Sequence, residues 1–261
     1  MYKEISFQDQ SIHYQISGKG PCLLLLHGFS ASSSHWDSFK KSFEANFTVI
    51  CPDMPGFGRS PVLTNFRMET MATAIDAILA QETIESCYFV GHSMGGYVAM
   101  AFAELFPNKL KGLCLFHSQP FADTEEKKQT RQKTIGFMER WGVAPFVAEL
   151  MPKLFAPSFV QKHPDILERL IAQASQLSLE SMVEATLAMI HRPDRSAVLQ
   201  NLEVPVFFIV GALDEAIPPD CSERQLRLPK HSTAMILDDV GHMGMYEAEA
   251  QVAAGLAGWL G

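Results

Sequence analysis

Five short apolar runs, separated by segments with helical spacing, constrain the fold of this chain more than any other feature. Such unbroken runs suit strands that are buried on both faces, as in a parallel sheet. The segments 67–82 and 94–106, which lie between runs, have apolar residues at helical spacing. Alternating strand and helix predicts an α/β fold. The runs are residues 22–26, 47–51, 87–90, 110–116 and 204–210.

The two ends of the chain add elements of a different kind. Residues 4–8 and 11–17 alternate apolar and polar side chains, which predicts a half-exposed antiparallel pair of strands. Near the other end, residues 233–237 predict a last strand and residues 246–260 a last helix.

The alternation stops between residues 121 and 200, where we find helical patterns and no convincing strand. A first helix is expected over 124–141 and a last one over 179–191. Pro145 and Pro164 suit the first turns of two helices between them. We therefore predict an α/β core of residues 1–120 and 201–261, with residues 121–200 inserted as a helical cap.

Composition excludes several classes of protein. The formal net charge is -8 and no Lys/Arg cluster occurs, which argues against a nucleic-acid partner. The five cysteines show no metal-like or CxxC spacing, which favours a reducing, cytoplasmic location. The N-terminus has no signal-peptide pattern, and the run 22–26 is too short to span a membrane. We expect a monomer or homodimer that acts on a small molecule.

The strongest chemical signal is a G-x-S-x-G motif around Ser93, directly after one predicted strand and directly before a predicted helix. A serine in so tight a turn has strained backbone angles, and the flanking Gly91 and Gly95 remove steric clashes. The start of the helix offers free N–H groups and a positive dipole end. The motif predicts Ser93 as a catalytic nucleophile, against the simpler interpretation of a glycine-rich turn.

A serine nucleophile needs a general base, and His242 is the predicted one. It lies in a loop after the final apolar run, where sheets of this type place functional groups. His117, which follows the run 110–116, is the only serious rival. His27 is expected to support a loop, and the side chain of His92 is expected to point away from Ser93.

The base needs an orienting carboxylate, and Asp214 is the predicted one because it follows the run 204–210. The order Ser, Asp, His along the chain agrees with this assignment. Glu215 is adjacent and chemically competent, and Asp123 follows the run 110–116, so both remain alternatives.

The N–H groups of Phe29 and Met94 are the predicted oxyanion donors. Phe29 lies in the loop after the first apolar run, and the neighbouring Gly28 would let the backbone approach a substrate. No metal is expected because there is no H-E-x-x-H motif and no His/Cys cluster. No cofactor is expected either, since Gly56-Phe57-Gly58 lacks the third glycine of a dinucleotide fingerprint.

Five motifs in order resemble the α/β-hydrolase fold superfamily, in its lid-bearing serine hydrolase branch. The resemblance implies a mostly parallel eight-stranded sheet with a helical cap after the sixth strand. It is closest to carboxylesterases, enol-lactonases and cofactor-free haloperoxidases, whereas related dehalogenases carry Asp in place of Ser93. The motifs are His27-Gly28-Phe29, the D-x-P-G-x-G-x-S loop at 53–60, Gly91 to Gly96, Gly211 to Asp214, and Gly241-His242.

The predicted cap is rich in aromatic and thioether side chains, some of which must face Ser93 if the cap closes the cleft. Phe137, Trp141, Phe146 and Met182 are the predicted pocket residues, although each could equally belong to the core of the cap. Phe137 and Trp141 are four residues apart and would share one helix face. We infer a small to medium, largely apolar substrate.

The residues together predict a hydrolase that cleaves a carboxylic ester, thioester or lactone through an acyl-enzyme. A lyase or carbon–carbon bond hydrolase with the same triad is the first alternative, because this constellation does not fix the reaction. A non-enzymatic ligand receptor on the same scaffold is the second.

Overall fold

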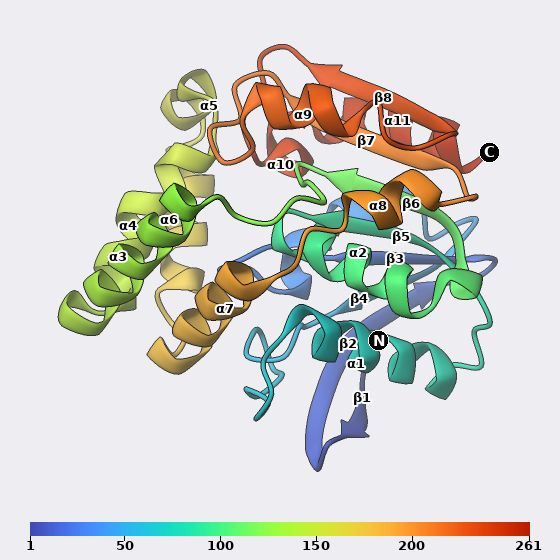
Figure 1. Cartoon of the computed structure of the whole chain (residues 1–261), viewed down its shortest axis with the longest axis horizontal. Coiled ribbons are helices and arrows are strands. Elements are labelled where there is room, and N and C mark those ends of the chain that lie inside the picture. The colour runs from blue at the N-terminus through green and yellow to red at the C-terminus, as the bar shows by residue number, and fades with distance from the viewer.

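An eight-stranded sheet forms the centre of the molecule in the computed structural model, which describes residues 1–261 (Figure 1). The strand order is β1-β2-β4-β3-β5-β6-β7-β8. β1 and β2 are antiparallel to their neighbours, and all later pairs are parallel. The strands are β1 (Tyr2–Phe7), β2 (Gln10–Gly18), β3 (Cys22–Leu26), β4 (Thr48–Pro52), β5 (Cys87–His92), β6 (Leu110–Phe116), β7 (Val206–Gly211) and β8 (Ser232–Leu237).

The sheet therefore confirms the fold class predicted from the apolar runs. β3 is buried along its whole length, as expected for a strand covered on both faces. β7 begins at Val206 rather than at residue 204, just after Pro205, which has no N–H to donate to a neighbouring strand.

Helices cover both faces of the sheet. Tyr88 and Phe89 are consecutive in β5, so their side chains point to opposite faces. Tyr88 packs against Trp259 and Phe89 against Phe102, which places the two helices carrying those residues on opposite sides. The helices of these layers are α1 (Met68–Gln81), α2 (Met94–Leu105), α8 (Ser196–Asn201), α9 (Pro219–Gln225), α10 (Gly244–Glu247) and α11 (Glu249–Leu260).

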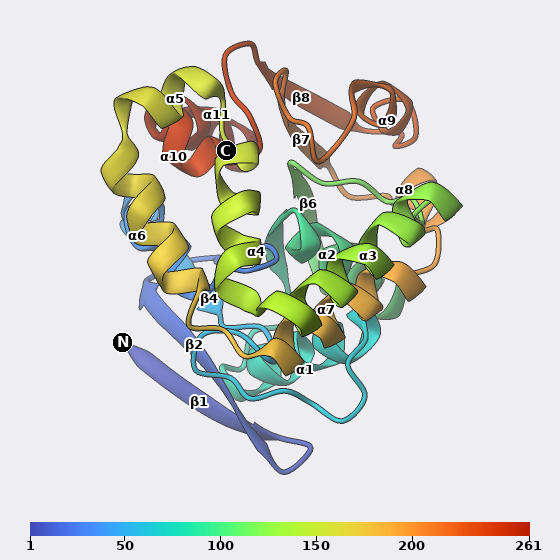
Figure 2. The same cartoon turned by 90° about the vertical axis from the view of Figure 1, so that its left-hand side faces the viewer.

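Helices alone occupy the chain between β6 and α8, and they gather at one side of the sheet (Figures 1 and 2). Within this group α3 packs against α4 and α7, and α4 packs against α6. α8, by contrast, packs against α2. The helical layer consists of α3 (Glu125–Trp141), α4 (Val143–Leu150), α5 (Pro157–Lys162), α6 (Pro164–Ala174) and α7 (Leu179–His191).

Four short 3-10 helices, none of them expected from the sequence, complete the chain. They are η1 (Ser33–Trp36), η2 (Phe39–Ser42), η3 (Pro107–Lys109) and η4 (Met151–Leu154).

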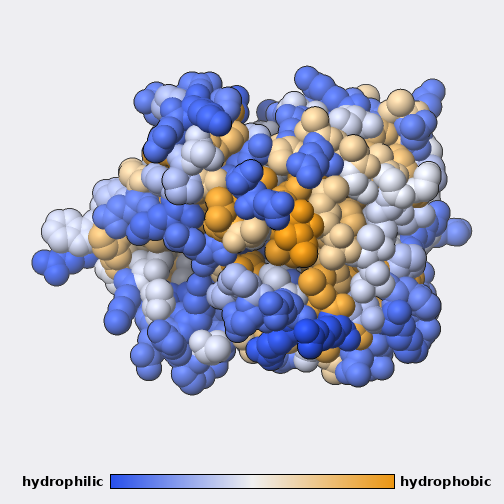
Figure 3. Space-filling model, turned by 90° about the horizontal axis from the view of Figure 1, so that it is seen from above, coloured by the Kyte–Doolittle hydropathy of each residue, from blue (hydrophilic) through white to orange (hydrophobic).

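Figure 3, which views the molecule from above, shows apolar surface in the middle of this face between hydrophilic side chains. No helix has both the length and the apolar character needed to cross a membrane.

Candidate active site

Ser93 lies at a sharp turn between β5 and α2, with backbone angles φ 52° and ψ −118°. This left-handed φ is strained for a residue with a Cβ. The turn is possible because its neighbours are glycines. A Cβ on Gly91 would lie 2.5 Å from the carbonyl oxygen of Gly95, and a Cβ on Gly95 would lie 2.5 Å from that of His27. The turn holds the serine hydroxyl out beyond the end of the sheet.

Asp214 and His242 come together at the same end of the sheet, from the loops after β7 and β8. The Nδ1 atom of His242 lies 2.8 Å from Oδ2 of Asp214, and both side chains are buried. The other carboxylate oxygen accepts the N–H groups of Ala216 (2.8 Å) and Ile217 (3.0 Å). These bonds orient the carboxylate toward the imidazole.

The surroundings keep Asp214 ionised. Burial by itself would raise the pKa of Asp214, but the neighbouring His242 and the hydrogen bonds from His117 and His242 outweigh that effect. The pKa of this carboxyl group is therefore held well below its usual range. A permanent carboxylate can fix the tautomer of His242 with the proton on Nδ1, which leaves Nε2 free to accept a proton.

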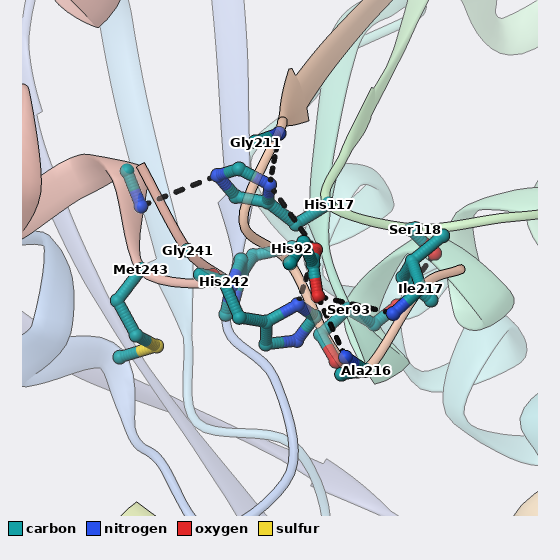
Figure 4. A network of polar contacts seen from close by, with 12 residues as sticks. His92, Ser93, His117, Ser118, Gly211, Ala216, Ile217, Gly241, His242 and Met243 are labelled. Atoms are coloured by element: carbon teal, nitrogen blue, oxygen red, sulfur yellow. Dashed lines mark hydrogen bonds and ion pairs between the residues drawn. The ribbon is translucent and has the colours of Figure 1, made fainter. Parts of the chain in front are cut away.

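His117, the rival base, lies on the far side of the same carboxylate (Figure 4). Its Nδ1 is 3.4 Å from Oδ2 of Asp214, and its Nε2 accepts the N–H of Gly244 at 3.2 Å. The N–H of Gly211 also lies 3.2 Å from Nδ1, so a backbone donor faces each of the two ring nitrogens. Burial lowers the pKa of His117, which favours the neutral form of the ring. Both ring nitrogens are thus engaged, and His117 is not placed to act on Ser93.

Two further contacts attach the loop of His242 to its surroundings. Nε2 of His92 donates to the carbonyl oxygen of His242 at 2.8 Å, and the N–H of His242 donates to the carbonyl oxygen of Leu154 at 2.8 Å. Burial lowers the pKa of His92 well below its ordinary value, so the ring stays neutral. His92 therefore points away from the hydroxyl of Ser93 and joins the turn at Ser93 to the loop of His242.

The carboxylate of Glu247 secures the same loop from the other side. It accepts the N–H groups of Gly241 (3.1 Å), Met243 (3.0 Å) and Ala156 (2.7 Å). Ala156 belongs to the helical layer, so Glu247 joins that layer to the residues on both sides of His242. The sequence contained no signal for this role, because the three donors are backbone groups.

The N–H groups of Phe29 and Met94 are both available to a ligand. The N–H of Phe29 donates to no protein group. Met94 is the first residue of α2, so its N–H has no acceptor within the helix. His27 supports the loop before Phe29, as expected: its Nε2 accepts the N–H of Met54 at 3.0 Å and its Nδ1 donates to the carbonyl oxygen of Gly28 at 2.8 Å.

A cavity of about 150 Å³ lies at this point, and both Ser93 and His242 line it. No hydrogen bond joins the hydroxyl of Ser93 to the imidazole. Such contacts commonly tighten only when substrate binds. The other lining residues are Phe29, Ser30, Ala31, His35, His92, Tyr97, Lys127, Arg131, Leu150, Met151, Leu154, Met189, Ala216 and Met243.

The four cap residues predicted to face the substrate do not line this cavity. Trp141 is 57% exposed and its ring lies against Arg140, so its predicted place in the pocket is wrong. Met182 is fully buried within the helical layer. Phe137 and Phe146 line a neighbouring outer cavity instead. Phe137 and Trp141 lie on one helix, but packing between helices decides where a helix face points.

The alternative acids are placed elsewhere. Asp123 forms ion pairs with Arg131 (2.5 Å) and Arg192 (2.8 Å), and Glu215 is exposed.

The ligand atoms of His117, Asp214 and His242 lie within 4.8 Å of one another, a spacing that could also suit a metal ion. The direct 2.8 Å contact between Asp214 and His242 is a hydrogen-bond distance, which accounts for their closeness without an ion.

Comparison with known proteins identifies the fold. The model of the family described as "alpha/beta hydrolase fold" matches residues 21–141. A thermophilic esterase from Thermogutta terrifontis, solved with malate bound, has a TM-score of 0.93 and 29% sequence identity, covering 100% of this chain and 98% of that one. The chain has the α/β-hydrolase fold.

Curated relatives of this chain include enzymes with different names. Lipase 3 of Moraxella sp. (strain TA144) is 24% identical over an alignment of 248 residues that covers 90% of this chain and 75% of the lipase. The 3-oxoadipate enol-lactonase 2 of Acinetobacter baylyi is 25% identical over an alignment of 240 residues that covers 90% of this chain and 87% of that enzyme.

Proposed function

We propose that this α/β hydrolase is a serine hydrolase that cleaves a carboxylic ester, thioester or lactone through an acyl-enzyme. Ser93 is the nucleophile, His242 the base and Asp214 the orienting acid. The observation that carries the proposal is the 2.8 Å contact between Asp214 and His242 beside the cavity that Ser93 also lines. Relatives named lipase, esterase and enol-lactonase support the same reaction class.

The first half of the reaction forms the acyl-enzyme. The hydroxyl oxygen of Ser93 attacks the carbonyl carbon while Nε2 of His242 takes the hydroxyl proton. The N–H groups of Phe29 and Met94 donate to the oxyanion of the tetrahedral intermediate. The intermediate then collapses, the carbon–oxygen bond to the alcohol breaks, and His242 returns its proton to the departing oxygen.

The second half releases the acid. Water attacks the acyl carbon, and His242 takes a proton from the water. The bond to Ser93 breaks, the serine oxygen recovers that proton, and the carboxylic acid leaves. Throughout both halves Asp214 stays ionised and stabilises the imidazolium. We propose that the helical layer α3–α7 acts as the cap that excludes bulk water from these steps.

The direct test is Ser93→Ala, assayed with p-nitrophenyl acetate and p-nitrophenyl butyrate. We expect turnover to fall to background while the folded structure is kept, since only the hydroxyl is removed. The matched control is Ser158→Ala, which removes a hydroxyl from an exposed position of α5. Mass spectrometry of the wild type should detect an acyl group on Ser93. Full activity of Ser93→Ala would refute the mechanism, and a wild type without ester turnover or an acyl adduct would favour the lyase or carbon–carbon hydrolase alternative.

A further inference from the structure

The cavity beside Ser93 is cationic although the whole chain is acidic. Lys127 and Arg131, which lie four residues apart on α3, both line it, and no Asp or Glu does. The formal net charge of the chain is -8. A cleft whose charge opposes that of the rest of the surface attracts ligands of the opposite sign.

The two cations differ in their ion pairs and hydrogen bonds with the protein. Arg131 is already paired, because its Nε donates to Asp123 at 2.5 Å, and Arg192 donates to the other oxygen of that carboxylate at 2.8 Å. The ammonium group of Lys127 forms no ion pair or hydrogen bond with the protein. Burial and the nearby Arg131 lower the pKa of Lys127, although Asp123 acts in the opposite direction. Lys127 is exposed, and it is the one cation lining the cavity that contacts no carboxylate.

Two buried polar atoms on the cavity wall also have no partner in the protein. They are the hydroxyl of Ser30 and Nδ1 of His35. Burial lowers the pKa of His35 to about 3, so this ring is neutral and contributes no charge. Neither group carries a charge that could neutralise a charged ligand, whereas Lys127 does.

The position of Lys127 suits the far end of a substrate. Together with Leu150, Leu154 and Ala216 it lines both the cavity of Ser93 and the outer cavity next to it. The wall of the inner cavity is otherwise largely apolar, with Leu150, Met151 and Met189 among its residues. A short methylene chain fits such a wall, and its terminal charge would meet the ammonium group at the junction.

We propose that the substrate is an ester or lactone that carries a carboxylate, and that Lys127 binds this carboxylate. The inference rests on the proposed hydrolase function and names its substrate class. We expect one carboxylate on the substrate, because Lys127 is the one cation lining the cavity that contacts no carboxylate of the protein. The half-ester of a linear dicarboxylic acid is the simplest molecule with these properties.

The test compares charged and neutral forms of one ester. The substrates are monomethyl succinate, glutarate and adipate, each against its dimethyl ester, with the rate corrected for the two equivalent ester groups. We expect the wild type to have the higher kcat/KM for a monoanionic ester. The ratio of the two kcat/KM values should fall by about 10- to 100-fold in Lys127→Met, as for loss of a hydrogen bond to a charged group. Lys127→Arg should restore most of the ratio, and added salt should reduce it in the wild type.

The control is Lys128→Met, which makes the same change in charge one residue along the helix. Lys128 is paired with Glu125 at 2.7 Å and does not line the cavity, so activity and ratio should remain as in the wild type. A wild type that hydrolyses the dimethyl esters without preferring the charged ones would overturn this inference and leave the hydrolase function standing. A preference that persists in Lys127→Met would overturn the role of Lys127. If no ester is hydrolysed at all, the proposed function fails together with the inference.

Discussion

Removal of the Glu247 carboxylate should both destabilise the fold and reduce activity, because this one group fixes the backbone on both sides of His242. It accepts the N–H groups of Ala156, Gly241 and Met243 at distances between 2.7 and 3.1 Å. All three donor residues are buried. In Glu247→Ala these N–H groups lose their acceptor, and water can reach them only by opening the contact between the loop and the helical layer.

The expected loss of stability follows from these contacts. A hydrogen bond to a charged group contributes roughly 1.5–3 kcal/mol. Burial raises the pKa of Glu247, which shows that desolvation of the carboxylate offsets part of this gain. Glu247→Ala should therefore lower the free energy of unfolding by about 2–4 kcal/mol, less than the sum over three bonds. For a chain of this size that corresponds to a fall in Tm of roughly 5–15 °C. Glu247→Gln, which keeps one acceptor oxygen, should lose about half as much.

The assays are guanidinium unfolding and steady-state ester hydrolysis, both with Glu249→Ala as control. Glu249 lies two residues further along and forms no ion pair or side-chain hydrogen bond. We expect kcat of Glu247→Ala to fall by about 10- to 100-fold, since a displacement of about 1 Å in a catalytic group can cost that much. If Glu247→Ala were as stable and as active as Glu249→Ala, the role assigned to this carboxylate would be refuted.

Four further outcomes are expected. Asp214→Asn should lower kcat by about 10³- to 10⁴-fold, because the amide cannot stabilise the imidazolium, and steady-state kinetics with p-nitrophenyl butyrate will measure it. Because the pKa of Asp214 is depressed, its carboxylate stabilises the fold above the unfolded pKa of about 3.9, and this contribution is lost as the pH falls toward the folded pKa. The urea concentration at the unfolding midpoint of the wild type should therefore decrease when the pH is lowered below about 4. The same decrease should be smaller in Asp214→Asn. Gly91→Ala should destabilise the protein by at least about 3 kcal/mol in thermal unfolding, since the new Cβ would lie 2.5 Å from the carbonyl oxygen of Gly95. Trp141→Ala should change stability by less than about 0.5 kcal/mol and leave kcat/KM unaltered, because the side chain is 57% exposed and remote from the cavity; a large loss of activity would show that it meets substrate after all.

Local patterns were sufficient to predict the sheet. The run at Cys22–Leu26 is apolar along its whole length, and in the structure every residue of β3 is buried. A strand covered on both faces needs no alternation, so its pattern can be recognised without knowledge of its neighbours. The turn at Ser93 was equally visible, because its strained φ requires glycines at fixed positions in the sequence.

Helix faces in the inserted segment were harder to predict. The spacing of Phe137 and Trp141 correctly placed them on one helix, but Trp141 faces solvent and Phe137 lines the outer cavity. Lys127 of the same helix meets the cavity of Ser93. Helical periodicity shows which residues share a face, whereas the direction of that face depends on how neighbouring helices pack.

The sequence by itself determined the order of strands and helices, the elbow that carries Ser93, and a short set of possible partners for it. Only the tertiary structure decided which of those partners meet: Asp214 contacts His242, whereas Glu215 is exposed and Asp123 is held by two arginines. It also revealed Glu247 and the unpaired ammonium of Lys127. The physical reason is that a strained turn or a buried strand depends on residues adjacent in the chain, whereas a hydrogen bond between loops depends on distances that folding alone sets.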